Sequence, residues 1–219
     1  LEFRRVLFRS FQDELDSVSQ SLVDLTDMVA LSVAKATESI LNSDLKLAEE
    51  VIASDDTIDE FQHALDARII DIIARQQPVA SDLRALVTAL RMSADLERMG
   101  DMSHHVAKIT RLRHPDAAIP TELIASFKQM GEAAEKIARK TGSVIASRDT
   151  QVALEVEKDD DEMDKLHRNL IRTLVDPSWK HGVESAIDLT LLGRYYERYA
   201  DHAVSVSRRV YYLVTGKFA

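Results

Sequence analysis

Two short stretches of the sequence repeat an arrangement of acidic residues that could bind a cation. Residues 95–101 read DLERMGD and residues 195–201 read YYERYAD, so each contains a Glu followed four positions later by an Asp. Residues four apart are neighbours on one face of an α-helix, where like charges cost about 0.2–0.5 kcal/mol. The adjacent Arg98 or Arg198 points about 100° away around the helix, so it cannot fully relieve the repulsion. Either these acids form a solvated face, or a cation binds between them.

The chemistry of the four acids favours a hard cation. They are Glu97, Asp101, Glu197 and Asp201. Carboxylate oxygens suit Mg²⁺, Mn²⁺ or Ca²⁺, and carboxylate-rich sites in helical bundles also take iron. His105 continues the first face by one further step of four residues, and its nitrogen would favour Zn²⁺ or iron. Acidic helices often contain this spacing, so it permits a metal site in each stretch without requiring one, and it leaves the identity of the metal open.

Six long helices are expected to position these acids. Apolar residues step by three and four through each segment, for example Leu15, Val18, Leu22, Leu25 and Val29 in the first. All four prolines fall between such segments, never within one. The pattern predicts helices over about 11–42, 44–76, 80–113, 121–147, 149–175 and 183–215. Because the breaks are short, neighbouring helices should run antiparallel, giving an all-α fold of six long antiparallel helices.

The six helices form two repeats of three. Residues 55–65, DDTIDEFQHAL, align with residues 160–170, DDEMDKLHRNL, and the two Glu-Arg motifs align at an offset of 100 residues. The sequence therefore predicts two tandem three-helix bundles, one over residues 11–115 and the other over 121–216. The second helix of each bundle carries Asp59 and Asp56 in the first repeat and their counterparts Asp164 and Asp161 in the second. Asp59 or Asp56, and likewise Asp164 or Asp161, could contribute a further ligand to the acids on the adjacent third helix.

The composition limits the classes of protein that fit. The net charge of the 219 residues is −9, and an acidic surface argues against nucleic-acid binding, where phosphate contacts need Lys and Arg. There is no cysteine, which excludes disulfides and thiolate metal sites. No run approaches the roughly 18 apolar residues of a membrane helix, and no stretch resembles a signal peptide. We therefore expect a cytoplasmic protein that is peripheral to a membrane only through its partners.

The first ten residues, LEFRRVLFRS, are interpreted separately from the rest. They resemble the in-frame translation of a common synthetic sequencing adapter, so we expect residues 1–10 to be non-native. The alternative is a frayed basic N-terminal segment. In either case these residues do not enter the fold prediction.

Two enzymatic interpretations fit the motifs less well. A catalytic di-iron bundle needs two Glu-x-x-His motifs inside the core, and Glu60-x-x-His63 occurs once, with Lys165-x-x-Arg168 as its repeat counterpart. A histidine phosphotransfer site around His105 would have Gly one position after Lys108, where this chain has Ile. A structural adaptor that shares the helical fold but binds no metal remains the stronger alternative.

The repeated motif resembles a known family. DLERMGD and YYERYADHAV, each late in a three-helix repeat, resemble the signature of PhoU-type phosphate-uptake regulators. Residues 78–115 and 179–216 extend the resemblance, the latter in a form similar to actinobacterial members, and it covers nearly all of 11–216. It implies two three-helix bundles in an elongated fold.

The resemblance also implies a function and a set of partners. Members of the family are non-enzymatic regulators that damp phosphate uptake and the phosphate-starvation response. They are thought to bridge the ATPase subunit of the phosphate ABC transporter and a phosphate-sensing histidine kinase. Many are homodimers, and some bind multinuclear metal clusters through motifs that correspond here to Glu97, Asp101, Glu197 and Asp201. For this chain, Mg, Mn, Zn and Fe remain possible metals.

Three departures from the family pattern bear on the site. The family often has Asn four residues after the motif Asp, where this chain has His105 and Ser205. Ala200 stands where Gly is usual, whereas Gly100 is retained. The two metal sites therefore need not be alike. The sequence shows no glycine-rich phosphate cradle and no clustered Arg pocket, so direct sensing of phosphate is not expected.

Overall fold

The computed structural model of the protein describes residues 2–217, with side chains from residue 11 onward. In chain order this part contains α1 (Glu2–Asn42), α2 (Leu45–Gln76), α3 (Ala80–Arg113), a 3-10 turn η1 (Thr121–Leu123), α4 (Ile124–Ser147), α5 (Thr150–Leu174) and α6 (Gly182–Thr215). The described residues form no strand, which confirms the all-α prediction. The predicted helix boundaries match these ends closely, except that α1 already begins at Glu2. The prediction that residues 1–10 are non-native stays a prediction; their side chains, and residue 1 altogether, lie outside the described part.

The turns between helices use local backbone chemistry that the sequence indicates. Ser43 and Arg148, at equivalent places in the two repeats, adopt left-handed φ angles of 52° and 55°. The Asp44 carboxylate accepts a hydrogen bond at 3.0 Å from a backbone N–H in the first turn of α2. The Asp149 carboxylate accepts two from the first turn of α5, at 2.8 and 3.2 Å. Gly216 ends α6 with φ 71°. Such caps satisfy N–H groups that a helix end leaves without partners.

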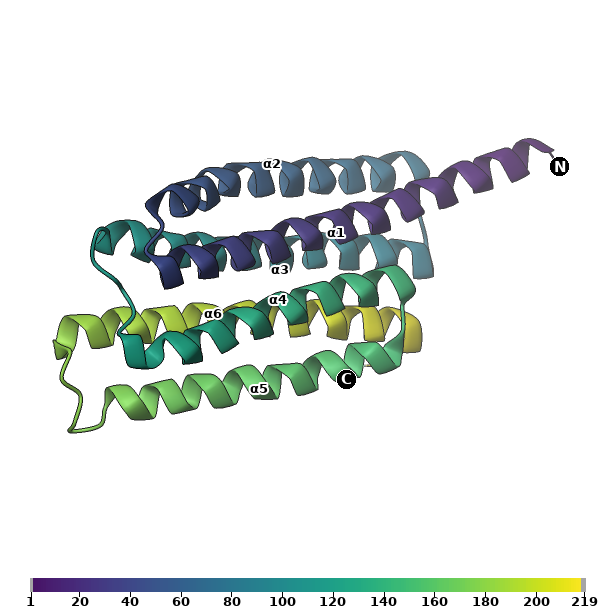
Figure 1. Cartoon of the computed structure of the whole chain (residues 1–219). Helices are drawn as coiled ribbons and strands as arrows, with labels where there is room; N and C mark the ends of the chain where they lie inside the picture. Colours follow the sequence, from purple (N-terminus) through teal and green to yellow (C-terminus); the bar gives the residue numbers. More distant parts are fainter. Residues whose placement is uncertain (1, 218–219) are drawn as a thin grey trace.

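The two groups of three helices lie side by side along their length (Figure 1). Helices α1, α2 and α3 pack on one another, and α4, α5 and α6 do the same. Between the groups, α1 packs against α4 and α3 packs against α6, so these four helices form the interface. Helices α2 and α5 lie on opposite outer sides (Figure 1). The predicted arrangement of two tandem three-helix bundles is confirmed.

The helices are amphipathic, and their apolar stripes meet in the interior. Leu25 and Val29 of α1, Phe127 of α4 and Tyr199 of α6 have no exposed surface. The steps of three and four residues that predicted the helices therefore mark their buried faces. Within the described residues, no helix combines the length and the apolar character that crossing a membrane requires.

The contact between α1 and α4 is close because α4 carries glycines there. A Cβ atom added to Gly131 would lie 2.6 Å from the Thr37 hydroxyl oxygen, closer than real Cβ contacts come. That hydroxyl is also 2.8 Å from the hydroxyl of Tyr196 on α6, so one contact joins three helices across the interface. At Gly142 an added Cβ would meet Thr26 at an ordinary 3.4 Å. The close approach of the two helices therefore requires glycine at position 131, whereas position 142 has room for a Cβ atom.

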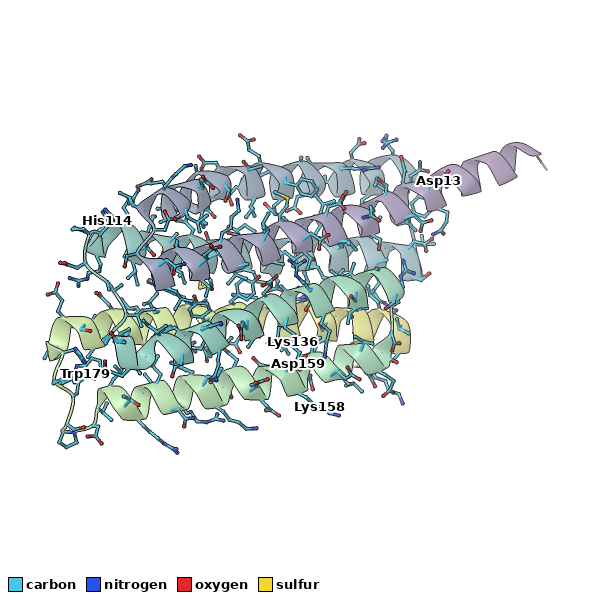
Figure 2. The ribbon with its side chains drawn as sticks, in the orientation of Figure 1. Asp13, His114, Lys136, Lys158, Asp159 and Trp179 are labelled. Atoms are coloured by element: carbon cyan, nitrogen blue, oxygen red, sulfur yellow. The ribbon has the colours of Figure 1, made fainter. Side chains whose placement is uncertain are left out.

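The outer helix α5 is fixed to α4 partly by charge. The Lys136 ammonium donates to the Asp159 carboxylate at 2.8 Å, and Lys140 lies 2.6 Å from the other oxygen of the same group. Figure 2 shows Lys136 and Asp159 facing one another between the two helices. These two cations lower the pKa of Asp159 even though burial opposes the shift.

Candidate functional site

The first acidic site lies where α2 packs against α3. It consists of Asp55 and Asp59, one turn apart on α2, and Glu97 and Asp101, one turn apart on α3. Partial burial raises the pKa of Glu97, and the charges of Asp101, Asp59 and Asp55 raise it further. The pKa of Asp59 is likewise raised by burial and by Asp55 and Asp101. The structure thus brings the predicted Glu97, Asp101 and Asp59 together from two helices.

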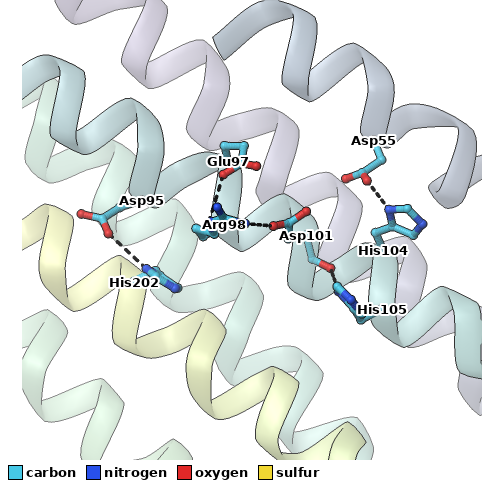
Figure 3. A network of polar contacts seen from close by, with 8 residues as sticks. All are labelled: Asp55, Asp95, Glu97, Arg98, Asp101, His104, His105 and His202. Carbon is cyan, nitrogen blue, oxygen red and sulfur yellow. Dashed lines mark hydrogen bonds and ion pairs between the residues drawn. The ribbon is translucent and has the colours of Figure 1, made fainter. Parts of the chain in front are cut away.

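Arg98 neutralises part of this charge. Its Nη1 donates to the Asp101 carboxylate at 2.7 Å, and its Nε lies 3.5 Å from a Glu97 oxygen (Figure 3). The Arg98 side chain is 57% exposed, and water screens such surface pairs strongly. The pKa of Glu97 stays raised in spite of Arg98. The arginine therefore relieves the repulsion only in part, as the sequence predicts.

The two neighbouring histidines turn in different directions. His104 Nδ1 forms a short hydrogen bond with the Asp55 carboxylate, whereas His105 Nδ1 lies 2.5 Å from the backbone carbonyl oxygen of Asp101 (Figure 3). The ring of His105 lies 5.1 Å from the ring of Tyr195 on α6. Its role as an extra ligand stays a prediction. His104 is the histidine that contacts a carboxylate of the site, and its buried Nε2 has no hydrogen-bond partner among the described residues.

The second acidic site repeats the arrangement where α5 packs against α6. It consists of Asp160 and Asp164 on α5 and Glu197 and Asp201 on α6. Burial raises the pKa of Asp160 to about 6, with further contributions from Asp201, Asp164 and Glu197. The pKa of Glu197 is also raised, by burial and then by Asp201, although Arg194 pairs with it. The predicted Glu197, Asp201 and Asp164 therefore also gather at one place.

The charges of both sites fit a cation, but their side chains do not yet enclose one. Asp160 Oδ1 is buried and accepts no hydrogen bond from the described residues, which costs free energy unless a partner is supplied. Oxygen ligands in this number suit a hard divalent ion. As the side chains stand, no three carboxylate or imidazole groups in the described part of the chain are arranged to hold a metal ion. Binding would require several of these side chains to turn toward one another.

Two members of the sites, Asp55 and Asp160, were not among the residues predicted from the sequence. Each is the first residue of an aligned Asp-Asp doublet, four positions before Asp59 or Asp164. That spacing places it on the same helix face as the predicted ligand. The aligned doublets at 55–56 and 160–161 were therefore the signal that could have identified them. The second member of each doublet is exposed.

The two sites differ in the packing beneath them. A Cβ atom added to Gly100 would lie 3.1 Å from a side-chain methyl of Ile58 on α2, so the glycine permits close approach of the two helices. In the second repeat the equivalent positions are Ala200 and Met163, and both are fully buried. Met has more rotatable bonds than Ile, so it can accommodate the extra methyl group. The departure from the family pattern at Ala200 thus has a packing explanation.

A third polar cluster joins the two repeats beside the first site. The carboxylate of Asp95 on α3 lies 3.1 Å from Nδ1 of His202 on α6 (Figure 3). It also accepts hydrogen bonds from Ser205 at 2.9 Å and Arg209 at 3.0 Å, both on α6. These partners lower the pKa of Asp95, although burial acts in the opposite direction. The repeat counterpart of Asp95 is Tyr195, so this link occurs on one side only.

Comparison with known proteins places the sequence in a family. A family profile described as the PhoU domain matches residues 22–110 and matches again at residues 127–210. The chain is 50% identical over 147 residues to the phosphate-specific transport system accessory protein PhoU homolog 2 of Mycobacterium tuberculosis, covering 67% of this chain and 69% of that protein. It is 43% identical over 145 residues to PhoU homolog 1 of the same organism, covering 66% of each.

Solved structures agree with the fold. The crystal structure of PhoU from Pseudomonas aeruginosa superposes with a TM-score of 0.84 at 28% identity, over 94% of this chain and 100% of that one. The phosphate transport system regulatory protein PhoU from Streptococcus pneumoniae gives a TM-score of 0.86 at 24% identity, over 95% and 99%. At that level of identity the second likeness shows the fold alone.

Proposed function

This chain belongs to the PhoU family, and from that premise we propose that it regulates cellular phosphate homeostasis by restraining phosphate uptake and the phosphate-starvation response. The observation that carries the proposal is the 50% identity, over two thirds of the chain, to a protein named as an accessory protein of the phosphate-specific transport system. In this role the protein works by binding its partners and catalyses no reaction. It acts in the cytoplasm, as a homodimer.

Two partners follow from this role. We propose that one partner is the ATPase subunit of the phosphate ABC transporter and that the other is a phosphate-sensing histidine kinase. The protein would bridge the two. The long molecule supports the proposal because its two bundles lie side by side and each carries its own acidic site. Two separate surfaces on packed bundles suit simultaneous contact with two proteins.

Pull-down experiments test the partner assignment. The purified full chain should capture the transporter ATPase subunit and the cytoplasmic part of the kinase, separately and together. The ATPase subunit of an unrelated ABC transporter is the matched control and should not bind. If neither partner is captured above that control, the bridging role is wrong.

We further propose that each acidic site holds metal ions. Glu97, Asp101 and Asp59 would hold a cation in the first site, with Asp55, and Glu197, Asp201 and Asp164 would hold one in the second, with Asp160. His105 remains a lower-ranked ligand. The raised pKa values support the proposal because these carboxylates are partly buried and lie beside other acids, so that their charged forms are disfavoured. A bound Mg, Mn, Zn or Fe ion would stabilise those charged forms.

Elemental analysis tests the metal proposal. Protein purified without chelator should contain metal, and the variant E97Q/D101N/E197Q/D201N should lose most of it because amides bind cations far less strongly than carboxylates. The variant D56N/D161N changes exposed acids of α2 and α5, the helices that face these acids, and should retain the metal. Equal metal content in all three proteins would contradict the site assignment.

Two alternatives are separated by the same measurements. An adaptor without metal would capture both partners while the acidic variant remained unaffected. A carboxylate-bridged di-metal enzyme would need its Glu-x-x-His motif inside the bundle, but Glu60 and His63 are exposed on α2. That exposure favours the regulatory role over the enzymatic one.

A further inference from the structure

A groove between α3 and α6 gathers four arginines from both repeats. Arg84 and Arg91 come from the first half of α3, and Arg208 and Arg209 come from the last half of α6. These halves lie side by side because the two helices pack against one another in opposite directions (Figure 1). The groove has a volume of about 360 Å³. The sequence shows no such pocket, because more than 100 residues separate the two arginine pairs along the chain.

The positive charge of this groove is only half compensated. Arg209 donates to Asp95 at 3.0 Å, and Arg208 donates to Glu157 at 2.5 Å. Arg84 lies over the ring of Tyr212, with its guanidinium carbon 5.7 Å from the ring centroid. Among the described residues, no carboxylate pairs with Arg84 or Arg91. Two uncompensated guanidinium groups therefore face one groove in a chain whose net charge is −9.

The repeat symmetry shows that this charge is specific to one end. The equivalent positions at the other end of the α3–α6 pair, 100 residues away in sequence, hold Glu184 in place of Arg84, and Leu191 in place of Arg91. There Arg113 of α3 lies 2.7 Å from Glu184 and 2.5 Å from Asp188, so two carboxylates neutralise the guanidinium charge at that end. The duplicated helices would give similar ends by default. The two ends instead differ, with arginines at 84 and 91 where the other end has an acid and a leucine.

We propose that this groove binds an oligophosphate anion. Guanidinium groups form paired hydrogen bonds with phosphate oxygens, which makes Arg the residue best suited to such ligands. Seven residues separate Arg84 from Arg91, which is about 10 Å along a helix axis. This span exceeds one orthophosphate and matches a chain of phosphoryl groups. The hydroxyl-bearing Thr88, only 7% exposed, lies in the groove between them.

Two sources could supply such an anion, and an adjoining cavity distinguishes them. An apolar cavity of about 490 Å³, lined by Leu15, Val18 and Leu213 among others, shares Arg84 with the groove. It could receive the base of a nucleoside triphosphate, whereas an inorganic oligophosphate would use the arginines alone. The inference rests on the groove and does not depend on the proposed regulatory role.

Isothermal titration calorimetry on the full chain tests the proposal. Tripolyphosphate, ATP, orthophosphate and citrate are titrated separately in buffer with EDTA, so that no cation at the acidic sites bridges the anion. Tripolyphosphate or ATP should bind saturably with one site per chain, and orthophosphate and citrate should bind at least about tenfold more weakly. Tighter binding of ATP identifies a nucleotide, and equal or weaker binding identifies an inorganic chain.

Variants locate the site. R84Q/R91Q should weaken the binding at least about tenfold, because two charge-assisted contacts are lost. K46Q/R68Q removes the same charge from exposed residues of α2 that pair with no other described residue, and it should change the Kd by less than about twofold. No binding by the wild type, equal binding of citrate or orthophosphate, or equal effects of the two variants would each overturn the proposal.

Discussion

At the scale of single residues, the acidic sites show that carboxylates are placed where folding alone would not favour them. Asp160 has a buried oxygen without a hydrogen-bond partner among the described residues, and burial, with further contributions from neighbouring acids, raises its pKa to about 6. The carboxylate of its repeat counterpart Asp55 does have a partner, because it forms a hydrogen bond with His104. The two sites thus share a plan but differ in how their charge is balanced, and the second should respond more strongly to protons and cations.

Replacing Asp160 should reveal the cost of its charge. The pKa of Asp160 is about 6 in the folded chain and about 4 when unfolded, so the folded form gains stability as pH falls from 7 toward 4. D160N should raise the free energy of unfolding at pH 7 by about 1 kcal/mol, less than the full shift implies because solvent screens the group. Its stability should also depend less on pH over that range.

Urea unfolding at pH 7 and pH 5 measures both effects. D161N is the matched control, since it removes the same charge from an exposed neighbour and should change little. A divalent cation that binds the second site should stabilise the wild type more than D160N. If D160N is less stable than the wild type at pH 7, the charge of the Asp160 carboxylate does not destabilise the fold.

At the scale of helices, glycines and caps set how closely the elements approach. In α4, Gly131 and Gly142 both face threonines of α1, but only Gly131 lies too close to Thr37 for any Cβ. Each repeat also starts its second helix from an Asp cap after a left-handed residue, which fixes the turn and therefore the pairing of the outer helix with the third helix. The acidic sites depend on that pairing, because each site contains two carboxylates from the second helix and two from the third.

Two glycine substitutions on the same helix should have opposite effects. G131A should destabilise the fold by about 1–3 kcal/mol, because the new methyl group must displace Thr37 and its contact with Tyr196. G142A should be neutral or stabilising by up to about 1 kcal/mol, because alanine favours the helix and the added contact is ordinary. Thermal unfolding followed by circular dichroism measures both. Equal destabilisation by the two changes would contradict the steric explanation.

At the scale of the whole molecule, the two repeats pack through α1 with α4 and α3 with α6, and polar contacts make this interface unequal along its length. Asp95 joins His202, Ser205 and Arg209 near the middle of the α3–α6 pair. Arg113 joins Glu184 and Asp188 at the end where α3 finishes and α6 begins. Different polar contacts therefore hold the bundles together along the length of this pair, and among the described residues Arg84 and Arg91 of its other end pair with no carboxylate.

Removing the charge of Asp95 should loosen this interface. Because its hydrogen-bond partners lower its pKa in the folded chain, its contribution is fully present above the unfolded value of about 4 and is lost as pH falls below it. D95N should therefore lower the free energy of unfolding at pH 7 by about 1–3 kcal/mol. The difference from the wild type should shrink toward about pH 3 as the carboxyl becomes protonated.

Denaturation at both pH values checks this prediction. D116N, in the exposed segment after α3, is the control and should have no comparable effect. A D95N defect that stays equally large at low pH would mean that the charge of Asp95 is not its source.

The sequence by itself determined the helices, the duplication and one half of each acidic site. Apolar steps of three and four, prolines between segments and Asp caps are local signals, so helix ends such as Asn42 and Arg113 were predictable. Glu97, Asp101, Glu197 and Asp201 were predictable because i and i+4 neighbours lie on one helix. The aligned second helices also indicated Asp59 and Asp164. Only the tertiary structure decided that Asp55 and Asp160 join them, that His104 and not His105 reaches a carboxylate, and that arginines from both repeats meet in one groove. Those outcomes depend on the rotation and approach of helices far apart in sequence, set by contacts such as Gly100 with Ile58 and Gly131 with Thr37.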